Sequence, residues 1–322
     1  MKLLILTQKV NQNDDVLGFF HGWIREFAKH AEQVTVIALG VGEYDLPKNV
    51  HVFSLGKERG VSRLGYIFNF YRFIWQERKN YDAVFVHMNP LYLLLGGSLW
   101  RALGKKIGLW YVHKNVDTKL RVAEKLSHII FTASRASFRL RSKKIHIVGH
   151  GIDTMIYNSV KKAPDTTFRI LTVGRIAPIK DYQTLIDAVA ILAKEIPNMG
   201  VDIVGGPLTD SDKDYAASLH ELVHKKHLDE VIHFVGSVPN KKIIQYLVQA
   251  DVFVNMSNTG SLDKAVLEAM ACGVPVVTSN EAIREVFGND VETLAFTSGS
   301  ASECAQRVKE VYDFPVSERE AL

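Results

Sequence analysis

Runs of apolar residues alternate along nearly the whole chain with segments in which apolar positions recur every three or four residues. The runs are typical of buried strands and the periodic segments of amphipathic helices. Because the two kinds of segment alternate, the pattern predicts an α/β protein whose parallel sheets are covered by helices on both faces. The expected strands are KLLILTQ, QVTVIAL, VHVFSL, YDAVFVHM, KKIGLWYVH, HIIFTAS and KIHIVGH, and then FRILTVG, VDIVGG, VIHFVGS, DVFVNM, VPVVTS and LAFTS.

These strands fall into two groups, separated by a polar segment at about 150–167 that contains a proline. A chain of 322 residues is also longer than one typical core requires. We therefore expect two doubly wound, Rossmann-like domains, at residues 1–157 and 158–322.

The helical segment 63–79 combines large apolar side chains with arginines. We expect most of its stripe to pack against a sheet, as a covering helix requires. A second segment, WRALGKK at 100–106, also mixes tryptophan with basic residues. As the alternative, both segments also fit a surface that rests on anionic lipid headgroups. The stripe comprises Leu64, Ile67, Phe68, Tyr71, Ile74 and Trp75.

Charge is divided unevenly between the two expected domains. Residues 1–157 hold 23 Lys and Arg against 12 Asp and Glu, or +11, whereas the remainder holds 16 against 23, or −7. A basic face of this kind indicates an anionic partner, either a membrane surface or an acidic substrate. Nucleic acid is not expected, because no nucleic-acid-binding module is visible.

Cysteine content and hydropathy indicate the compartment. Cys272 and Cys304 are the only cysteines, so no disulfide framework is expected and a reducing cytoplasm fits. The longest apolar run, Leu91–Trp100, is too short to cross a bilayer. The expected location is cytoplasmic, with a peripheral position at the inner face of the membrane as an open alternative.

The stretch 255–285 is the first candidate for chemistry, because a strand, a turn at Gly260, a helix over Ser261–Cys272 and a second strand follow in succession. A helix that begins directly after a strand presents free N–H groups and the positive end of its dipole, which suits phosphate. Glu268 lies within this helix. Taken alone, it is most simply a partner for Lys264 on a solvated helix face.

A second strand-to-helix turn follows FRILTV. It carries Arg175 after Gly174, and Lys180 stands just before the next helix. Two cations and a helix N-terminus at one turn predict a site for phosphate or pyrophosphate.

In the first domain, His113 closes the fifth expected strand, where doubly wound folds bind ligands. It is therefore a candidate to face a substrate. The spacing of the 12 histidines predicts no metal site. Gly18 lies in the loop after the first strand, but a G-x-G-x-x-G fingerprint is absent there.

Several of these motifs together resemble a known family. GRIAPIKDYQTLIDA, VDIVGGP, VIHFVGSVP, ADVFVNMS and AVLEAMACGVPVVTS, preceded by HGIDTMIYN, are similar to the donor-binding domain of retaining glycosyltransferases of the GT-B fold, family four. The resemblance covers about 148–285. It implies two Rossmann-like domains that face each other across a cleft, with the acceptor on the first and a UDP- or GDP-sugar on the second. It also implies retention of anomeric configuration, with no metal and no cofactor.

The resemblance assigns roles by motif position. Arg175 and Lys180 would bind the donor pyrophosphate, Glu268 the ribose, and His113 would reach the transferred sugar. The base would lie near Gly236–Pro239. The donor-binding residues implied in this way are Gly18, Gly205, Gly206, Val238, Gly260, Ser261, Leu262 and Glu268.

One departure from the family pattern concerns catalysis. The family signature is a pair of glutamates, of which Glu268 is the second, but the first position holds Gly260. Backbone N–H groups from Gly260 to Leu262 remain available to a sugar. Asp263 either supplies the missing carboxylate or only offsets the helix dipole. A further departure is His150, where an asparagine is usual.

The expected function is therefore transfer of a sugar from a nucleotide-sugar to a glycan or lipid-linked acceptor. Two alternatives stay open: a nucleotide-sugar epimerase or hydrolase, and a donor-binding subunit without turnover, which Gly260 favours. The chain ends at SEREAL, before the terminal helix usual in the family, as expected of a compact or truncated member.

Overall fold

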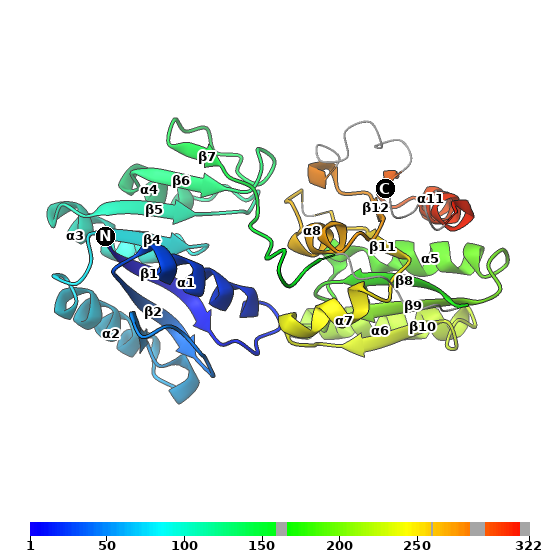
Figure 1. Ribbon diagram of the computed structural model, residues 1–322, viewed down its shortest axis with the longest axis horizontal. Coiled ribbons are helices and arrows are strands. Elements are labelled where there is room, and N and C mark those ends of the chain that lie inside the picture. The colour runs from blue at the N-terminus through cyan, green and yellow to red at the C-terminus, as the bar shows by residue number, and fades with distance from the viewer. Residues whose placement is uncertain (159–165, 259, 284–293, 316–322) are drawn as a thin grey trace. The chain divides into compact units, whose positions relative to one another are not determined.

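The computed structural model describes residues 1–158, 166–258, 260–283 and 294–315 (Figure 1). It divides the chain into two compact units. The first comprises Met1–Gly149 and Pro239–Lys241, and the second His150–Val238 and the chain from Lys242 onward. The end of the stretch singled out above, at 284–285, and the C-terminal residues 316–322 lie outside the described residues.

The first unit is built on a parallel sheet in the order β3-β2-β1-β4-β5-β6-β7. The order reverses between β1 and β4, which is the doubly wound arrangement expected from the alternating pattern. Its strands are β1 (Lys2–Val10), β2 (Gln33–Val41), β3 (Val50–Ser54), β4 (Ala83–His87), β5 (Lys106–Trp110), β6 (Ile129–Thr132) and β7 (Ile145–Ile147). Its helices are α1 (Gly18–His30), α2 (Arg63–Gln76), α3 (Leu91–Ala102) and α4 (Thr118–Leu126), with a short 3-10 turn η1 (Lys57–Arg59).

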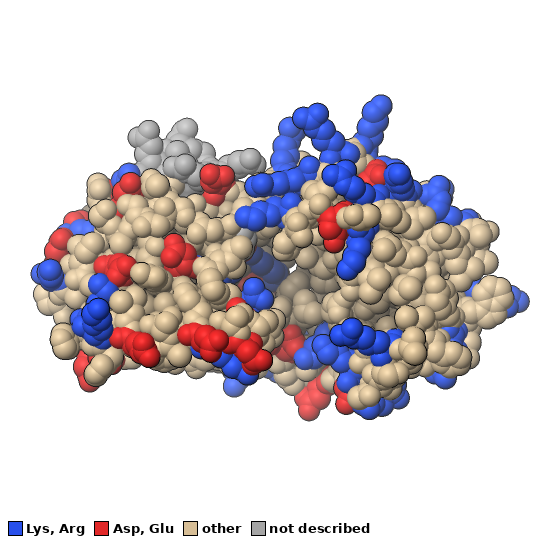
Figure 2. Space-filling model, turned by 180° about the vertical axis from the view of Figure 1, so that it is seen from behind, with Lys and Arg blue, Asp and Glu red and all other residues tan. Residues whose placement is uncertain are grey.

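The core of the first unit lies between its sheet and the helices α2, α3 and α4. The strands contribute unbroken apolar runs because side chains on both faces of a parallel sheet are covered. Trp100, from the expected aromatic and basic segment, is fully buried at 0% exposure. Figure 2 shows basic side chains gathered on the first unit, in the right half of that view.

Helix α2 differs from the expectation. Phe70, Phe73 and Ile74 form its buried face. The other members of the expected stripe are exposed, from 40% at Ile67 to 79% at Leu64, so the prediction that most of the stripe packs on the sheet is wrong. Apolar residues occupy both faces of this helix, and periodicity alone therefore selected the wrong one.

The second unit is built on a parallel sheet in the order β10-β9-β8-β11-β12, which reverses between β8 and β11. Two doubly wound α/β units are thus confirmed. The strands are β8 (Phe168–Val173), β9 (Met199–Val204), β10 (Ile232–Gly236), β11 (Val252–Asn255) and β12 (Val276–Thr278). The helices are α5 (Tyr182–Leu192), α6 (Asp210–Lys225), α7 (Ile243–Leu247), α8 (Lys264–Ala271) and α11 (Ala301–Asp313), with 3-10 turns η2 (Pro178–Lys180) and η3 (Asn240–Lys242).

Two expected elements of the second unit differ in extent. LAFTS forms no strand but a single parallel bridge between Ala295 and Thr278. The helix expected from Ser261 begins only at Lys264. None of the helices in the described ranges is both long and apolar enough to cross a membrane.

Candidate functional site

The candidate site lies at the carboxyl edge of the second sheet. All strands of this sheet are parallel, so the loops that follow β8, β9, β10, β11 and β12 emerge along the same edge. The strand order reverses between β8 and β11, and doubly wound folds bind ligands at such a reversal. The predicted donor-binding residues of this unit all follow these strand ends.

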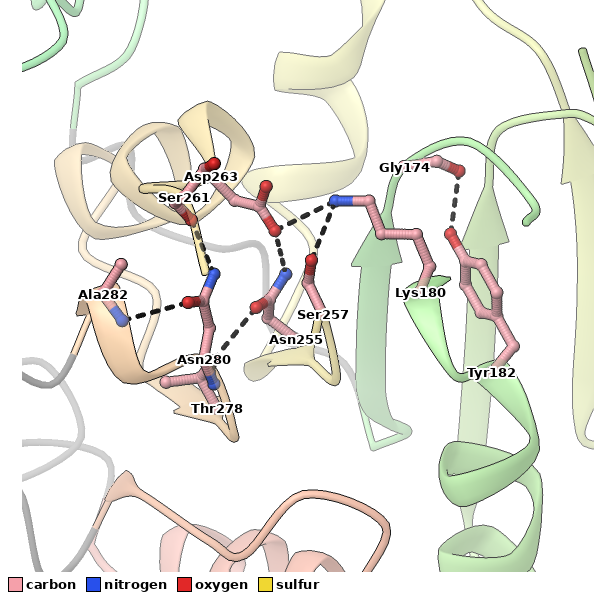
Figure 3. A network of polar contacts seen from close by, with 10 residues as sticks. All are labelled: Gly174, Lys180, Tyr182, Asn255, Ser257, Ser261, Asp263, Thr278, Asn280 and Ala282. Atoms are coloured by element: carbon pink, nitrogen blue, oxygen red, sulfur yellow. Dashed lines mark hydrogen bonds and ion pairs between the residues drawn. The ribbon is translucent and has the colours of Figure 1, made fainter. Parts of the chain in front are cut away.

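Lys180 and Asp263 join two turns that are far apart in the sequence (Figure 3). Lys180 Nζ lies 3.0 Å from Asp263 Oδ2 and donates to Ser257 Oγ at 3.2 Å. The two charged side chains are only 20% and 16% exposed. A half-buried ion pair therefore links the turn before α5 to the turn before α8.

Asp263 is held by a chain of hydrogen bonds with a fixed direction (Figure 3). The backbone N–H of Asn280 donates to Thr278 Oγ1, and the Thr278 hydroxyl then donates to Asn255 Oδ1 at 3.0 Å. With its oxygen occupied in this way, Asn255 donates through Nδ2 to Asp263 Oδ2, also at 3.0 Å. Asn255 is only 5% exposed, so its amide must be satisfied by protein groups.

The same contacts determine how the carboxylate of Asp263 is oriented. Asp263 occupies the N-cap position of α8, but its side chain makes no capping hydrogen bond. Oδ2 accepts from Lys180 and Asn255, whereas Oδ1 accepts from none of the described residues. The carboxylate is therefore turned toward the Lys180 turn and away from the helix N–H groups.

The turn from Gly260 to Asp263 is anchored by a second asparagine. Asn280 Nδ2 donates to the carbonyl of Ser261 at 2.8 Å, and its Oδ1 accepts from the N–H of Ala282 at 3.1 Å. Gly260 has a φ of +62°, in the left-handed region that favours glycine. A glutamate in this backbone conformation would be strained.

Glycines let the neighbouring loops approach closely. Gly205 has a φ of +141°, and a Cβ there would lie 2.0 Å from the carbonyl oxygen of Gly174. A Cβ on Gly206 would lie 2.6 Å from Ser237 Oγ. Tyr182 fixes the same turn, because its hydroxyl donates to Gly174 O at 2.8 Å (Figure 3). Backbone groups of three strand ends are thereby brought together.

Arg175 and Lys180 lie on the same turn, but Arg175 is more exposed to solvent. The Arg175 side chain is 42% exposed, and its Nε lies 4.0 Å from Asp212 Oδ2, the carboxylate of the capping box of α6. Lys180 is inserted between α5 and α8, whereas Arg175 stays in contact with solvent. Val238, expected near the base, is half-buried in the loop after β10.

Glu268 is not on a solvated face. It forms the expected ion pair with Lys264 through Oε1, but its side chain is only 4% exposed and that of Lys264 17%. Lys264 Nζ also lies 5.7 Å from the centroid of the Tyr157 ring. The pairing is thus confirmed, and the expectation of an exposed position is wrong, because the segment carrying Tyr157 covers this part of α8.

His150 belongs to the same cluster. Burial lowers its pKa to about 4, and the positive charge of Lys264 acts in the same direction, while the backbone at Leu262 and the carboxylate of Asp263 oppose it. The ring is therefore neutral near pH 7. The asparagine usual at this position is also neutral.

The predicted residues of the first unit lie at the carboxyl edge of its own sheet. His113 is exposed and accepts the N–H of Asn115 at Nδ1, 3.1 Å away. It was expected to close a strand, but β5 ends at Trp110, so His113 stands in the following loop. Gly18 is the first residue of α1 and donates its N–H to Asp14 O.

Polar residues at two strand ends were missed by sequence reasoning. Asn255 closes β11 and Thr278 closes β12, neighbours in the sheet. The available signal was that each apolar run ends in a polar residue. The carboxyl ends of neighbouring parallel strands meet at one edge of the sheet, so residues at these two positions lie close together. Tyr182 carried no comparable signal. Among the described residues no group of three or more His, Cys, Asp or Glu could hold a metal ion.

The chain is similar to known glycosyltransferases. Residues 156–322 match the family model described as glycosyl transferases group 1. An amylovoran biosynthesis glycosyltransferase, AmsK, from Erwinia amylovora is 28% identical over 172 residues, which are 51% of this chain and 41% of that protein. A D-inositol 3-phosphate glycosyltransferase from Catenulispora acidiphila is 34% identical over 125 residues, which are 38% and 29% of the two chains. The chain thus spans less than half of the length of these relatives.

Solved structures support the same fold along the whole chain. HepE of Anabaena, solved in complex with UDP and glucose, superposes with a TM-score of 0.79 at 21% identity, covering 100% of this chain and 92% of HepE. A sucrose-phosphate synthase from Thermosynechococcus elongatus gives a TM-score of 0.79 at 16% identity, covering 99% and 92% of the two chains. These likenesses confirm the expected GT-B fold class, and the matched family model shows that the chain belongs to the glycosyl transferases group 1 family.

Proposed function

We propose that this glycosyltransferase moves a sugar from a UDP- or GDP-sugar to a glycan or lipid-linked acceptor with retention of anomeric configuration. The observation that carries the proposal is the Lys180–Asp263 pair at the reversal of the second sheet. Arg175 stands on the same turn, and α8 begins directly after Asp263. Cations beside a helix N-terminus suit a nucleoside diphosphate.

The chemistry follows from charge. As the bond between the anomeric carbon and the diphosphate oxygen breaks, negative charge grows on the leaving group, and cations fixed in advance stabilise it. Lys180 is held in position by Ser257 and Asp263. Arg175 is 42% exposed, and it would complete the diphosphate site from the solvent side.

Asp263 is the proposed carboxylate in place of the glutamate absent at position 260. Its Oδ1 is not engaged by the described residues, so it can accept a hydroxyl of the transferred sugar while Oδ2 stays on Lys180. The N–H groups of Gly260, Ser261 and Leu262 would donate to the same sugar. His113 is proposed to reach this sugar from the first unit.

Glu268 is proposed to hydrogen-bond the donor ribose. Among the described residues, Lys264 is the partner of its carboxylate, which it contacts at Oε1. Gly205, Gly206 and Val238 would line the approach to the base, and Gly18 would contribute from the first unit. The reaction is proposed to need neither metal nor cofactor. UDP-bound HepE, with the same fold, supports a nucleotide at such a site.

Donor binding tests the assignment directly. Replacing Arg175 and Lys180 by alanine together should lower UDP or GDP affinity by about a hundredfold or more in calorimetry, because two charge-assisted contacts are lost. Lys213→Ala is the matched control, since among the described residues Lys213 pairs only with the exposed Asp210 on α6. Unchanged affinity in the double variant would contradict the proposal.

Turnover separates transfer from the alternatives. Asp263→Asn should retain UDP binding and lose most transfer to a supplied acceptor. Release of free sugar without an acceptor would favour a hydrolase. Donor binding without transfer by the unaltered protein, whatever acceptor is supplied, would favour a binding subunit, the function that Gly260 leaves open.

A further inference from the structure

Helix α2 presents an apolar stripe to solvent on the face opposite its packed side. Leu64 is 79% exposed, Phe68 67% and Trp75 51%, and the intervening Ile67 and Tyr71 are 40% and 41% exposed. From Leu64 to Trp75 this stripe is about 16 Å long at the helical rise. A continuous row of large apolar side chains in water is unusual for a protein without a partner on that surface.

The charges around this stripe are mostly positive. Helix α2 contains Arg63 and Arg72 but no acidic residue, and its C-cap Glu77 is followed directly by Arg78 and Lys79. In the described part of the chain, none of these four cations forms an ion pair with a carboxylate. The Arg78 guanidinium instead lies 4.4 Å from the Trp75 ring centroid.

We propose that this stripe, Leu64 to Trp75 on α2, docks the protein onto the surface of an anionic lipid bilayer. The apolar side chains would enter the boundary between headgroups and acyl chains, and the cations would lie at the level of the headgroup phosphates. Trp75 has the amphipathic ring that favours this interface, whereas the Tyr71 hydroxyl donates to Leu95 O on α3. This inference is independent of the proposed reaction and holds for any activity of the chain.

Charge argues against the other occupants of the same face. A two-fold dimer through α2 would place Arg63 and Arg72 of one copy against the same residues of the other, so like charges would oppose the association. A nucleic acid would use the cations but would leave Leu64 and Phe68 exposed to water. Only a surface that is both apolar and anionic satisfies both parts of the patch.

Vesicle sedimentation tests the proposal with the full chain. We expect binding to vesicles of phosphatidylcholine mixed with phosphatidylglycerol, weak binding to phosphatidylcholine alone, and release by salt. Leu64→Ser with Phe68→Ser should lower the partition coefficient about tenfold or more. Both side chains are mostly exposed, so the fold should be retained, as circular dichroism will show. Leu208→Ser is the matched control, because Leu208 is 62% exposed in the second unit.

Two further variants resolve the parts of the patch. Arg63→Gln with Arg72→Gln should weaken binding and reduce its dependence on salt. Brominated lipids should quench the fluorescence of Trp75, and Trp75→Phe should remove most of this quenching, because Trp100 and Trp110 are 0% and 4% exposed and Trp23 is half-buried.

Three results would overturn the proposal. The first is failure to bind anionic vesicles, and the second is equal binding by the Leu64/Phe68 variant. The third is a dimer in solution that this variant dissociates while the unaltered protein ignores lipid, which would make a second copy the occupant.

Discussion

The two sheets differ in the residues that end their strands at the reversal of strand order. In each unit the strand order reverses next to the first strand, and the strand beyond the reversal is β4 in one and β11 in the other. The last residue of β4 is His87, 1% exposed, and the last residue of β11 is Asn255, 5% exposed. Both positions are buried and polar, but they are satisfied in different ways.

In the first unit the edge is packed with rings. His87 stacks on Phe20 with ring centroids 3.9 Å apart, and Thr7 Oγ1 lies 3.2 Å from its Nδ1. Trp23 meets Trp110 edge to face at 4.9 Å. In the second unit Asn255 is linked to Asp263 and Thr278 by hydrogen bonds, and the neighbouring strand ends carry glycines.

The difference teaches how one fold class makes two kinds of surface. Stacked rings fill the first edge with side chains. Glycines remove side chains from the second edge, so N–H groups and a held charge pair are presented there. The second edge therefore suits the diphosphate proposed to bind there, whereas the rings of the first edge are mostly buried.

A methyl group at Gly205 should break the second edge most strongly. Gly205→Ala places Cβ 2.0 Å from Gly174 O at a φ of +141°, so we expect the second unit to lose about 4 kcal/mol or to fail to fold. All four tryptophans lie in the first unit. The urea transition by circular dichroism should therefore change while the tryptophan transition stays.

Gly22→Ala is the control for this substitution. Gly22 lies in α1, and a Cβ there meets nothing within 4 Å. The first unit should gain up to about 1 kcal/mol from the better helix former. If Gly205→Ala unfolds at the same urea concentration as the unaltered protein, the close approach of the chain after β8 and after β9 is not needed for stability.

The second largest effect on stability is expected at the buried Lys264–Glu268 pair. Glu268→Gln leaves Lys264 without its counter-ion at 17% exposure, so we expect a loss of about 3 kcal/mol in the second unit. Asp313→Asn breaks the Lys309–Asp313 pair of α11, which has the same spacing but a carboxylate 57% exposed, and should cost about 0.5 kcal/mol or less. Equal effects on the chemical unfolding midpoint would show that burial does not strengthen the first pair.

The sequence predicted these edges unequally. Alternating apolar runs predicted both sheets, and a strand-to-helix turn pointed to Arg175 and Lys180, because such signals are local. Gly205 and the role of Glu268 were implied only by the family resemblance. The Lys180–Asp263 contact joins positions 83 apart in sequence, so no local pattern could reveal it. Periodicity failed at α2 and at Glu268 for one reason: it says which residues share a face but not which face a neighbouring segment covers.

The pH dependence of the second unit should reveal His150. Its pKa of about 4 in the folded chain lies below the ordinary 6.5, so the unfolded chain binds more protons between these values. The contribution of His150 is thus present above pH 6.5 and is lost as pH falls toward 4. We expect the free energy of unfolding to fall by about 2 kcal/mol over this window, since the ring is half-buried.

The variant His150→Asn isolates this contribution from that of other titrating groups. The difference in unfolding free energy between the unaltered protein and the variant should change across pH 6.5 to 4, measured by circular dichroism in urea. His233→Asn is the control, because His233 is exposed on β10 in the same unit. A pH-independent difference for His150→Asn would show that folding does not lower the pKa of His150.

The smallest effect separates hydrogen bonding from packing at the aromatic edge. Thr7→Val keeps the shape of a fully buried side chain but removes the hydroxyl beside His87 Nδ1, which should cost the first unit about 1 kcal/mol by tryptophan fluorescence in urea.

Thr35 is equally buried on β2, yet its Oγ1 has no hydrogen-bond partner among the described residues. Thr35→Val should therefore stabilise the unit by about 1 kcal/mol, since a buried hydroxyl without a partner is unfavourable. Opposite signs for two identical substitutions would show that His87, like Asn255, depends on its hydrogen bond; equal signs would mean that ring packing alone holds the first edge.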